Sequence, residues 1–133
     1  MATHVAPLTR DRLASLPDSY FRAVDAMDVD AVLSHFADDA TLTVQTDHVT
    51  FDGADEIRRM FTDFFSASTS IFHEILNIVV EPEARKVATE QTYIGELVDG
   101  GKNDMHNCNF FDVNEEGKFT RVIIWMAGTN PLK

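Results

Sequence analysis

The side chain best placed to do chemistry is a histidine inside the apolar, β-branched-rich run that covers residues 70–80. Side chains of a strand alternate between two faces, so this run predicts His73, Ile75 and Asn77 on one face. The other face is expected to be almost wholly apolar, with Phe72, Leu76, Ile78 and Val80. An imidazole can both accept and donate a proton near neutral pH. If its face of the strand lines a cavity, His73 is the expected reactive group.

Length and composition indicate one globular domain over residues 1–133, with a loose N-terminal arm at residues 1–7. The net charge of −11 disfavours nucleic acid and anionic membranes as partners, because both would be repelled. A single cysteine, Cys108, excludes an internal disulfide and fits a reducing cytosol, so a cytoplasmic location is expected. No signal peptide or membrane helix is predicted. No spacing of His, Cys or Asp matches a metal centre, and no cofactor is expected.

Helices are predicted in the first half of the chain. Ser15 and Asp18 are typical of a helix start, and this helix is expected to reach Met27, with an additional turn at residues 9–14 left open. Asp28 can cap a second, short helix. A third helix begins in the acidic segment at residues 52–56. The apolar stripes of the three helices are Leu16, Tyr20, Val24 and Met27, then Val29, Val32, Leu33 and Phe36, then Ile57, Met60, Phe61, Phe64 and Phe65.

Strands dominate the second half of the chain. One strand at residues 41–46, with a short return strand ending at Phe51, is predicted between the second and third helices. Four long strands follow, separated by turns, at residues 70–81, 86–98, 104–113 and 118–127. Helices followed by long antiparallel strands indicate the α+β class, with the helices packed on one face of a curled sheet around a pocket.

Three stretches resemble the SnoaL-like branch of the nuclear transport factor 2-like superfamily. Residues 20–30 resemble its first-helix signature, residues 36–42 its helix-to-strand turn, and residues 51–57 the loop that opens its third helix. The resemblance implies a cone-shaped α+β barrel, in which a curved, mostly antiparallel sheet wraps around about three N-terminal helices and encloses a pocket. This fold hosts isomerases, cyclases, dehydratases, hydrolases and non-catalytic binders, so it does not by itself fix a function.

Ketosteroid isomerases of this superfamily place a tyrosine on the first helix, a basic aspartate on the first strand and an acid on a late strand. Tyr20 matches the tyrosine, whereas Val44 and Asn109 stand at the other two positions. Because valine cannot move a proton, steroid isomerase chemistry is disfavoured.

The scytalone dehydratase-like branch is a better match. Its members pair an aspartate near the end of the first helix with a histidine early in the third long strand, and Asp25 and His73 stand at these positions. Tyr20 resembles a tyrosine of the bile-acid dehydratase. The resemblance implies that Asp25 fixes the tautomer of His73, that His73 acts as the base, and that Tyr20 binds a substrate oxygen.

The other catalytic residues of these enzymes are matched less well in this sequence. His106 stands near a second histidine of scytalone dehydratase, but strand alternation prevents His106 and Asn109 from both facing inward without a bulge. No arginine precedes the turn at residues 114–117 to match the one in the related dehydrochlorinase. The residues expected to bind the ligand are Phe36, Val44, Phe61, His106, Asn109 and Trp125.

Two functions stay open. One is a cofactor-free enzyme that acts on a small apolar cyclic molecule through His73. It would be a lyase or dehydratase, or else an isomerase or cyclase that uses the same base. The alternative is a module that binds a small hydrophobic ligand without catalysis, or that serves dimerisation. An outer sheet face with Phe72, Leu76, Ile78 and either Trp125 or Ile123 would leave a large apolar patch, which predicts a homodimer through the sheet.

Overall fold

A computed structural model describes residues 8–127 of the chain, which form three α-helices, six strands and one 3₁₀ turn. Residues 1–7, expected to form a loose arm, lie outside the described residues. The elements follow the order α1 (Arg10–Asp25), α2 (Val29–Leu33), β1 (Phe36–Val44), η1 (Gln45–Asp47), β2 (Val49–Asp52), α3 (Ala54–Ser66), β3 (Ser68–Glu81), β4 (Lys86–Leu97), β5 (Lys102–Val113) and β6 (Phe119–Trp125).

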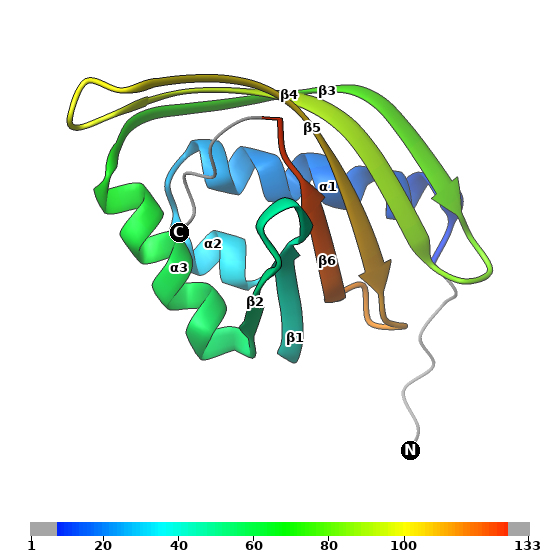
Figure 1. Cartoon of the computed structure of the whole chain (residues 1–133). Helices are drawn as coiled ribbons and strands as arrows, with labels where there is room; N and C mark the ends of the chain where they lie inside the picture. The colour runs from blue at the N-terminus through cyan, green and yellow to red at the C-terminus, as the bar shows by residue number, and fades with distance from the viewer. Residues whose placement is uncertain (1–7, 128–133) are drawn as a thin grey trace.

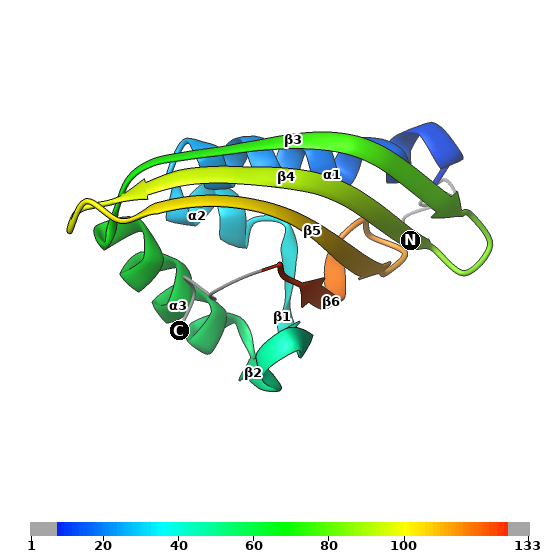
Figure 2. The same ribbon diagram turned by 45° about the horizontal axis from the view of Figure 1, so that its top comes forward.

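All six strands belong to one curved sheet with the strand order β2-β1-β6-β5-β4-β3. Only the β1–β6 pair is parallel, and the other four neighbouring pairs are antiparallel. The long strands β3, β4 and β5 curve over α1 (Figures 1 and 2). The predicted α+β class and the curved sheet are therefore confirmed, but the sheet does not close into a barrel. Its two edges are β2 and β3.

The N-terminal helix is one continuous element. Thr9 caps it, because its hydroxyl accepts the main-chain N–H of Arg12 at 3.0 Å. The additional turn left open by the sequence is thus the beginning of α1, and Pro17 lies buried inside the helix rather than at its start. Asp28 caps α2 as predicted, accepting the N–H of Ala31 at 3.1 Å.

A register shift in β3 changes which of its side chains face the helices. Ile75 pairs with Gln91 of β4, but Asn77 pairs with Glu90, so Leu76 is an extra residue on the β3 side. Such a bulge exchanges the two faces of the strand beyond it. His73 and Ile75 face inward as predicted. The expectation that Asn77 shares their face, and that Ile78 and Val80 lie on the outer one, is wrong, because Ile78 and Val80 pack against the core and Asn77 is exposed.

The core lies between the concave face of the sheet and helices α1 and α3. Its largest fully buried side chains are aromatic and come from α3, β5 and β6: Phe61, Phe111 and Phe119. Phe36, expected on the second helix, begins β1 instead, and its ring packs edge-on against Tyr20 of α1. This aromatic core holds α1 in place, and α1 in turn carries Tyr20 and Asp25 toward the sheet. No helix within residues 8–127 has the length and apolar character needed to cross a membrane.

Candidate active site

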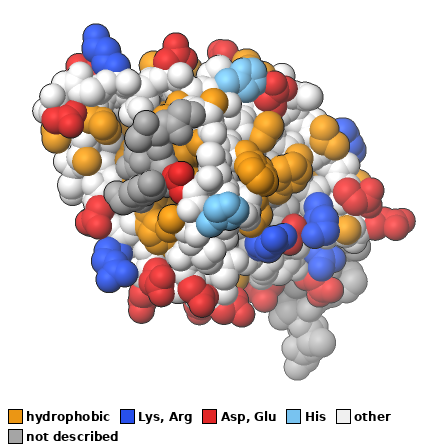
Figure 3. All heavy atoms as spheres, in the orientation of Figure 1, with side chains coloured by type: hydrophobic (Ala, Val, Ile, Leu, Met, Phe, Trp, Pro, Cys, Tyr) orange, Lys and Arg blue, Asp and Glu red, His pale blue; other side chains and the backbone are white. Residues whose placement is uncertain are grey.

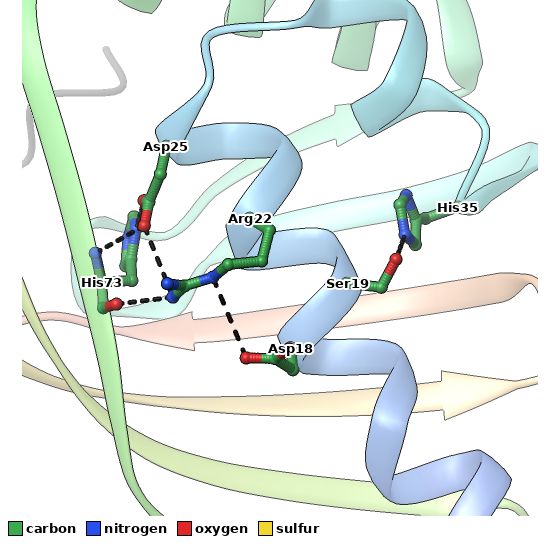
Figure 4. Close-up of polar contacts among 6 residues, drawn as sticks. All are labelled: Asp18, Ser19, Arg22, Asp25, His35 and His73. Carbon is green, nitrogen blue, oxygen red and sulfur yellow. Dashed lines mark hydrogen bonds and ion pairs between the residues drawn. The ribbon is translucent and has the colours of Figure 1, made fainter.

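Asp25 and His73, 48 positions apart in the sequence, meet where the last turn of α1 touches β3. The Nδ1 atom of His73 lies 2.6 Å from Oδ1 of Asp25. The second carboxylate oxygen, Oδ2, accepts the main-chain N–H of His73 at 3.0 Å. One carboxylate therefore holds both the ring and the backbone of the histidine (Figure 4).

The backbone contact exists because β3 is an edge strand. His73 stands opposite Tyr93 of β4, and no strand lies on its other side. Polar main-chain groups on a free edge need other partners. Asp25 accepts the N–H of His73, and Arg22 donates from Nη2 to its carbonyl oxygen at 2.6 Å. Helix α1 thus completes the hydrogen bonding of the edge at this residue.

The same contacts fix the tautomer of the imidazole. An ionised carboxylate can only accept hydrogen bonds, so Nδ1 of His73 must carry the proton in the bond to Asp25. In the neutral ring the lone pair is then on Nε2. Arg22 also lies 3.4 Å from Oδ2 of Asp25, which places a positive charge beside the carboxylate.

Both faces of the His73 ring are in contact with aromatic residues. Its ring stacks on Phe21 at 4.7 Å and on Tyr93 at 5.3 Å between centroids. The side chain is only 12% exposed and that of Asp25 14%. Since Nδ1 is bound to Asp25 and the ring planes are packed, the Nε2 edge is the part of the imidazole left for a ligand.

A neighbouring glycine allows Tyr93 to adopt this position. The Tyr93 ring lies so close to Gly95 that a Cβ atom there would collide with it. Asn103 donates to the Tyr93 hydroxyl at 3.5 Å, and burial raises the pKa of this tyrosine.

A cavity of about 40 Å³ adjoins the histidine. Its wall is mainly aromatic, formed by Phe21, Phe61, Phe64 and Tyr93, and the polar groups of Tyr20, His73 and Asn107 also face it. Tyr20 is buried, which raises the pKa of its hydroxyl. Among residues 8–127, none makes a hydrogen bond to that hydroxyl, and the oxygen is not sealed from the cavity. The arrangement combines an imidazole, a carboxylate bound to it and a neutral hydroxyl around one mainly apolar space.

Residues 18–122 match the family model of the SnoaL-like domain. The chain belongs to this family. Three solved structures are similar to this SnoaL-like chain over most of its length. A proposed aromatic ring hydroxylase from Novosphingobium aromaticivorans is 29% identical, with a TM-score of 0.81, and the match covers 92% of this chain and 96% of that one.

The other two are more distant in sequence. A proposed SnoaL-like polyketide cyclase from Shewanella denitrificans is 10% identical, with a TM-score of 0.79 and coverage of 86% and 90%. An NTF2-like protein of unknown function from Exiguobacterium is 22% identical, with a TM-score of 0.74 and coverage of 86% and 99%. Both support the predicted nuclear transport factor 2-like fold. The comparison with curated proteins found no match.

The SnoaL-like chain places only part of the expected ligand-binding set at the cavity. Phe61 lines it, whereas Phe36, Val44 and Asn109 are buried elsewhere in the core. The carbonyl oxygen of the Asn109 side chain accepts a hydrogen bond from Gln91 at 2.9 Å. Asn109 therefore serves a buried polar contact between β4 and β5.

The expectation that His106 and Trp125 bind the ligand is wrong, because both lie on the outer face of the sheet. His106 is exposed and pairs with Glu90 at 2.5 Å, and Trp125 is 48% exposed. Strand β5 alternates without a bulge at this point, so Asn107 and Asn109 face inward and His106 outward.

Three polar residues of the site were not assigned to it from the sequence: Arg22, Tyr93 and Asn107. The same holds for the apolar lining residues Phe21, Val24, Phe64, Ile124 and Met126. The face of Asn107 follows from alternation with the buried Phe111 on the same strand, so a signal for it was present. The role of Arg22 depends on how α1 crosses the edge of β3, and this crossing cannot be predicted from a local residue pattern. Within the part of the chain that the structure describes, no cluster of three His, Cys, Asp or Glu side chains could hold a metal ion.

Proposed function

We propose that this SnoaL-like protein is a cofactor-free enzyme that moves a proton on a small, largely apolar cyclic molecule. His73 is the base, Asp25 orients it, and Tyr20 binds a substrate oxygen. The observation that carries the proposal is the double contact of Asp25 with the ring and backbone of His73, at the wall of an aromatic cavity.

The chemistry follows from the tautomer. With Nδ1 protonated and held by Asp25, Nε2 of His73 can take a proton from a carbon atom of the ligand, and the carboxylate stabilises the imidazolium that results. A positioned base of this kind contributes roughly 10²–10⁴-fold to a rate. The electron pair left on carbon can expel a leaving group, as in a dehydratase. It can also move into a neighbouring carbonyl, as in an isomerase or cyclase.

The similarity to a proposed polyketide cyclase supports isomerisation or cyclisation, at the level of fold. The cavity supports it chemically, since apart from His73 only neutral polar groups, from Tyr20, Tyr93 and Asn107, face the space. A hydroxide leaving group needs a proton donor close by, whereas an oxygen that gains negative charge needs only hydrogen-bond donors.

Exchange of carbon-bound hydrogen in D₂O tests the proposal without knowledge of the natural substrate. Wild type and His73→Ala are incubated with a panel of small cyclic ketones and hydroxyketones, and incorporation of deuterium is followed by proton NMR. His106→Ala is the matched control, because it removes an exposed histidine from the opposite face of the sheet. Exchange should be fast with wild type and the control and fall at least 100-fold in His73→Ala. Equal rates in all three proteins would rule out His73 as the base.

A non-catalytic binding function is the second candidate. The incomplete set of leaving-group partners favours it, because among residues 8–127 the cavity is lined by no arginine and by no second histidine. In that case the ligand panel would bind, as seen by NMR titration, without any exchange that depends on His73.

We also propose that a second copy of the chain covers the outer face of the sheet. Figure 3 shows hydrophobic side chains gathered on the face of the molecule seen in Figure 1, beside side chains of both charges. Exposed Phe110 and Trp125 lie in a shallow groove there with Ile123, next to the ion pair of Lys86 and Asp112. A surface that carries both signs of charge around an apolar centre can pair with itself across a twofold axis.

A further inference from the structure

The polar groups that face the cavity are few, and their hydrogen bonds can be counted. Four of the lining side chains are polar: Tyr20, His73, Tyr93 and Asn107. The Tyr93 hydroxyl accepts a hydrogen bond from Asn103 and keeps its own hydrogen, and Nδ1 of His73 is engaged by Asp25. What remains for a ligand is one acceptor, Nε2 of His73, the O–H hydrogen of Tyr93, and the polar groups of Tyr20 and Asn107 that have no protein partner.

The orientation of the Asn107 amide is set by a residue that follows β6. The main-chain N–H of Ala127 donates to Oδ1 of Asn107 at 3.0 Å. A backbone N–H can only donate, so the atom that it meets must be the amide oxygen. The amide nitrogen Nδ2 therefore offers its two hydrogens elsewhere. Within residues 8–127 this nitrogen has no hydrogen-bond partner, and it is not sealed from solvent.

The second free group is the hydroxyl of Tyr20, which is buried at the centre of the aromatic core yet open to the same cavity. Burial in this apolar setting keeps the phenol protonated, because it raises its pKa. Tyr20 is thus a neutral donor, as is Asn107. Each group would gain a hydrogen bond from a ligand oxygen that the protein itself does not supply.

We propose that Tyr20 and Asn107 together bind one oxygen atom of a neutral carbonyl compound whose neighbouring C–H faces Nε2 of His73. This inference concerns the substrate class and rests on the proposed function of His73. Among residues 8–127 no lysine or arginine lines the cavity, so a carboxylate or phosphate would lose its hydration there without meeting a counter-charge from them. The net charge of −11 opposes anions as well.

The proton transfer at such a site balances without a further reactant. Nε2 of His73 takes the proton from the carbon next to the carbonyl, and the C–H electron pair forms a carbon–carbon double bond. The π pair of the carbonyl moves to oxygen, which becomes an enolate held by the hydroxyl of Tyr20 and the amide of Asn107. Return of the proton from His73, to the same carbon or a conjugated one, completes exchange or isomerisation.

The size of the cavity limits how the ligand enters. An apolar cavity that holds benzene in another protein measures about 150 Å³, far more than the space of about 40 Å³ seen beside His73. A ring therefore inserts only its carbonyl edge, and its remaining atoms lie outside the enclosed volume. Met126, a half-buried residue of the lining, can move to accommodate them. Methionine is flexible enough to make room for them.

NMR titration of the full-length chain tests the site directly. The probes are cyclohexanone, methylenecyclohexane, which lacks the oxygen, and cyclohexanecarboxylate, which carries a negative charge. The side-chain amide signal of Asn107 in ¹⁵N-labelled protein should shift and saturate with cyclohexanone and stay in place with the other two probes. Binding of the carboxylate as tightly as the ketone, or no response of Asn107 to the ketone up to its solubility limit, would overturn the proposal.

Asn107→Asp is the sharpest variant, because it keeps the oxygen that accepts the N–H of Ala127 and replaces only the free donor. It should weaken cyclohexanone binding about tenfold, and Tyr20→Phe should weaken it about three- to tenfold. Asn77→Asp, an equivalent change at an exposed position of β3, should leave binding unchanged. Unchanged binding in Asn107→Asp would exclude the amide from the site.

Failure of this inference can be told apart from failure of the proposed function. If Asn107 responds to the ketone but deuterium exchange is the same in wild type and His73→Ala, the oxygen site stands and the base assignment falls. If exchange depends on His73 but Asn107→Asp alters neither binding nor exchange, the base stands and the oxygen site falls.

Discussion

Arg22 donates a hydrogen bond of 2.6 Å from its guanidinium to the main-chain carbonyl oxygen of His73. The residue that carries the proposed base is thereby held at three points by α1: ring nitrogen, backbone N–H and backbone carbonyl. A strand edge is ordinarily one of the more mobile parts of a sheet. Here two charged side chains from α1 take the place of the missing neighbouring strand. The backbone of His73 is therefore fixed in position, and its ring is fixed in one tautomer.

Replacement of Arg22 should loosen this arrangement. Arg22→Met is expected to lower the free energy of unfolding by about 1 kcal/mol, because a charge-assisted hydrogen bond at a partly exposed position is lost. It should also broaden the ¹⁵N signals of the His73 ring and reduce deuterium exchange. Arg58→Met is the matched control, since Arg58 has the same 48% side-chain exposure and its ion pair with Asp30 is on the surface. That pair should contribute little, about 0.5 kcal/mol or less. Equal effects of the two substitutions would contradict the positioning role.

Asp25→Asn should disturb the tautomer while leaving the shape of the site. An amide can offer only one acceptor oxygen, whereas His73 presents two donors to Asp25, Nδ1–H and the backbone N–H. Its NH₂ group would therefore face one of these donors. We expect a fall of about 10²–10⁴-fold in His73-dependent exchange. The ¹⁵N shifts of the ring should move away from the Nδ1–H form. A variant that keeps both the shifts and the rate of wild type would show that Asp25 does not orient the base.

The pKa of both tyrosines of the chain should lie above the ordinary value of about 10, with the larger shift at Tyr20. Burial raises the pKa of both Tyr20 and Tyr93 in the folded protein. The unfolded chain ionises first, so stability is complete below about pH 10 and falls as the pH rises above it. Absorbance at 295 nm should therefore show that phenolate formation in the folded protein is displaced to a pH above 10. A smooth titration of either tyrosine near pH 10 in folded protein would contradict this expectation.

Gly95→Ala should damage the site through Tyr93. The new methyl group would collide with the Tyr93 ring, which must then leave its stack on His73. We expect a loss of about 1–3 kcal/mol in the free energy of unfolding, typical of overpacking. Thr92→Ala, which stands on the same strand with its side chain on the other face, is the control and should cost much less. Urea unfolding measures both, and an unchanged midpoint for Gly95→Ala would contradict the close contact.

Light scattering should report a dimer that depends on the outer face. Phe110→Glu combined with Trp125→Glu places charges in the exposed apolar groove and should give a monomer, while the cavity-side variant Phe64→Leu should stay dimeric. Wild type that is monomeric at micromolar concentration would reject the proposed self-association.

Much of the fold could be predicted because it depends on local patterns. Helix caps such as Asp28 and the apolar stripe of α3 depend only on residues that are close in the sequence. The signature stretches between residues 20 and 57 indicated the family. Asp25 and His73 could be paired only through that resemblance, since their contact joins distant segments. Strict alternation gave the correct face for His73 but the wrong one for Ile78. The position of a bulge depends on pairing with β4, so the sequence of β3 does not show it.

His106 illustrates a different kind of error. The resemblance places it near a second histidine of scytalone dehydratase, one residue away from Asn107, the side chain that faces the cavity. A histidine is the more reactive group, but the pleat of β5 decides which neighbour points inward. A site assigned from residue type alone is therefore wrong when the reactive residue stands one position away from the residue that faces the cavity.

The extra residue at Leu76 divides β3 into two segments whose side chains are out of phase. The upstream segment presents His73 and Ile75 to the interior, and the downstream segment presents Ile78 and Val80. Removal of this one residue would restore an unbroken period of two, in which His73, Ile75, Ile78 and Val80 share one face of a regular strand without a bulge. The alternation of inward and outward side chains thus shifts by one residue at Leu76. The segment before it serves the proposed active site, and the segment after it serves the core. Deletion of Leu76 would therefore join the two segments into one regularly alternating strand, whereas a substitution in either segment leaves the bulge in place.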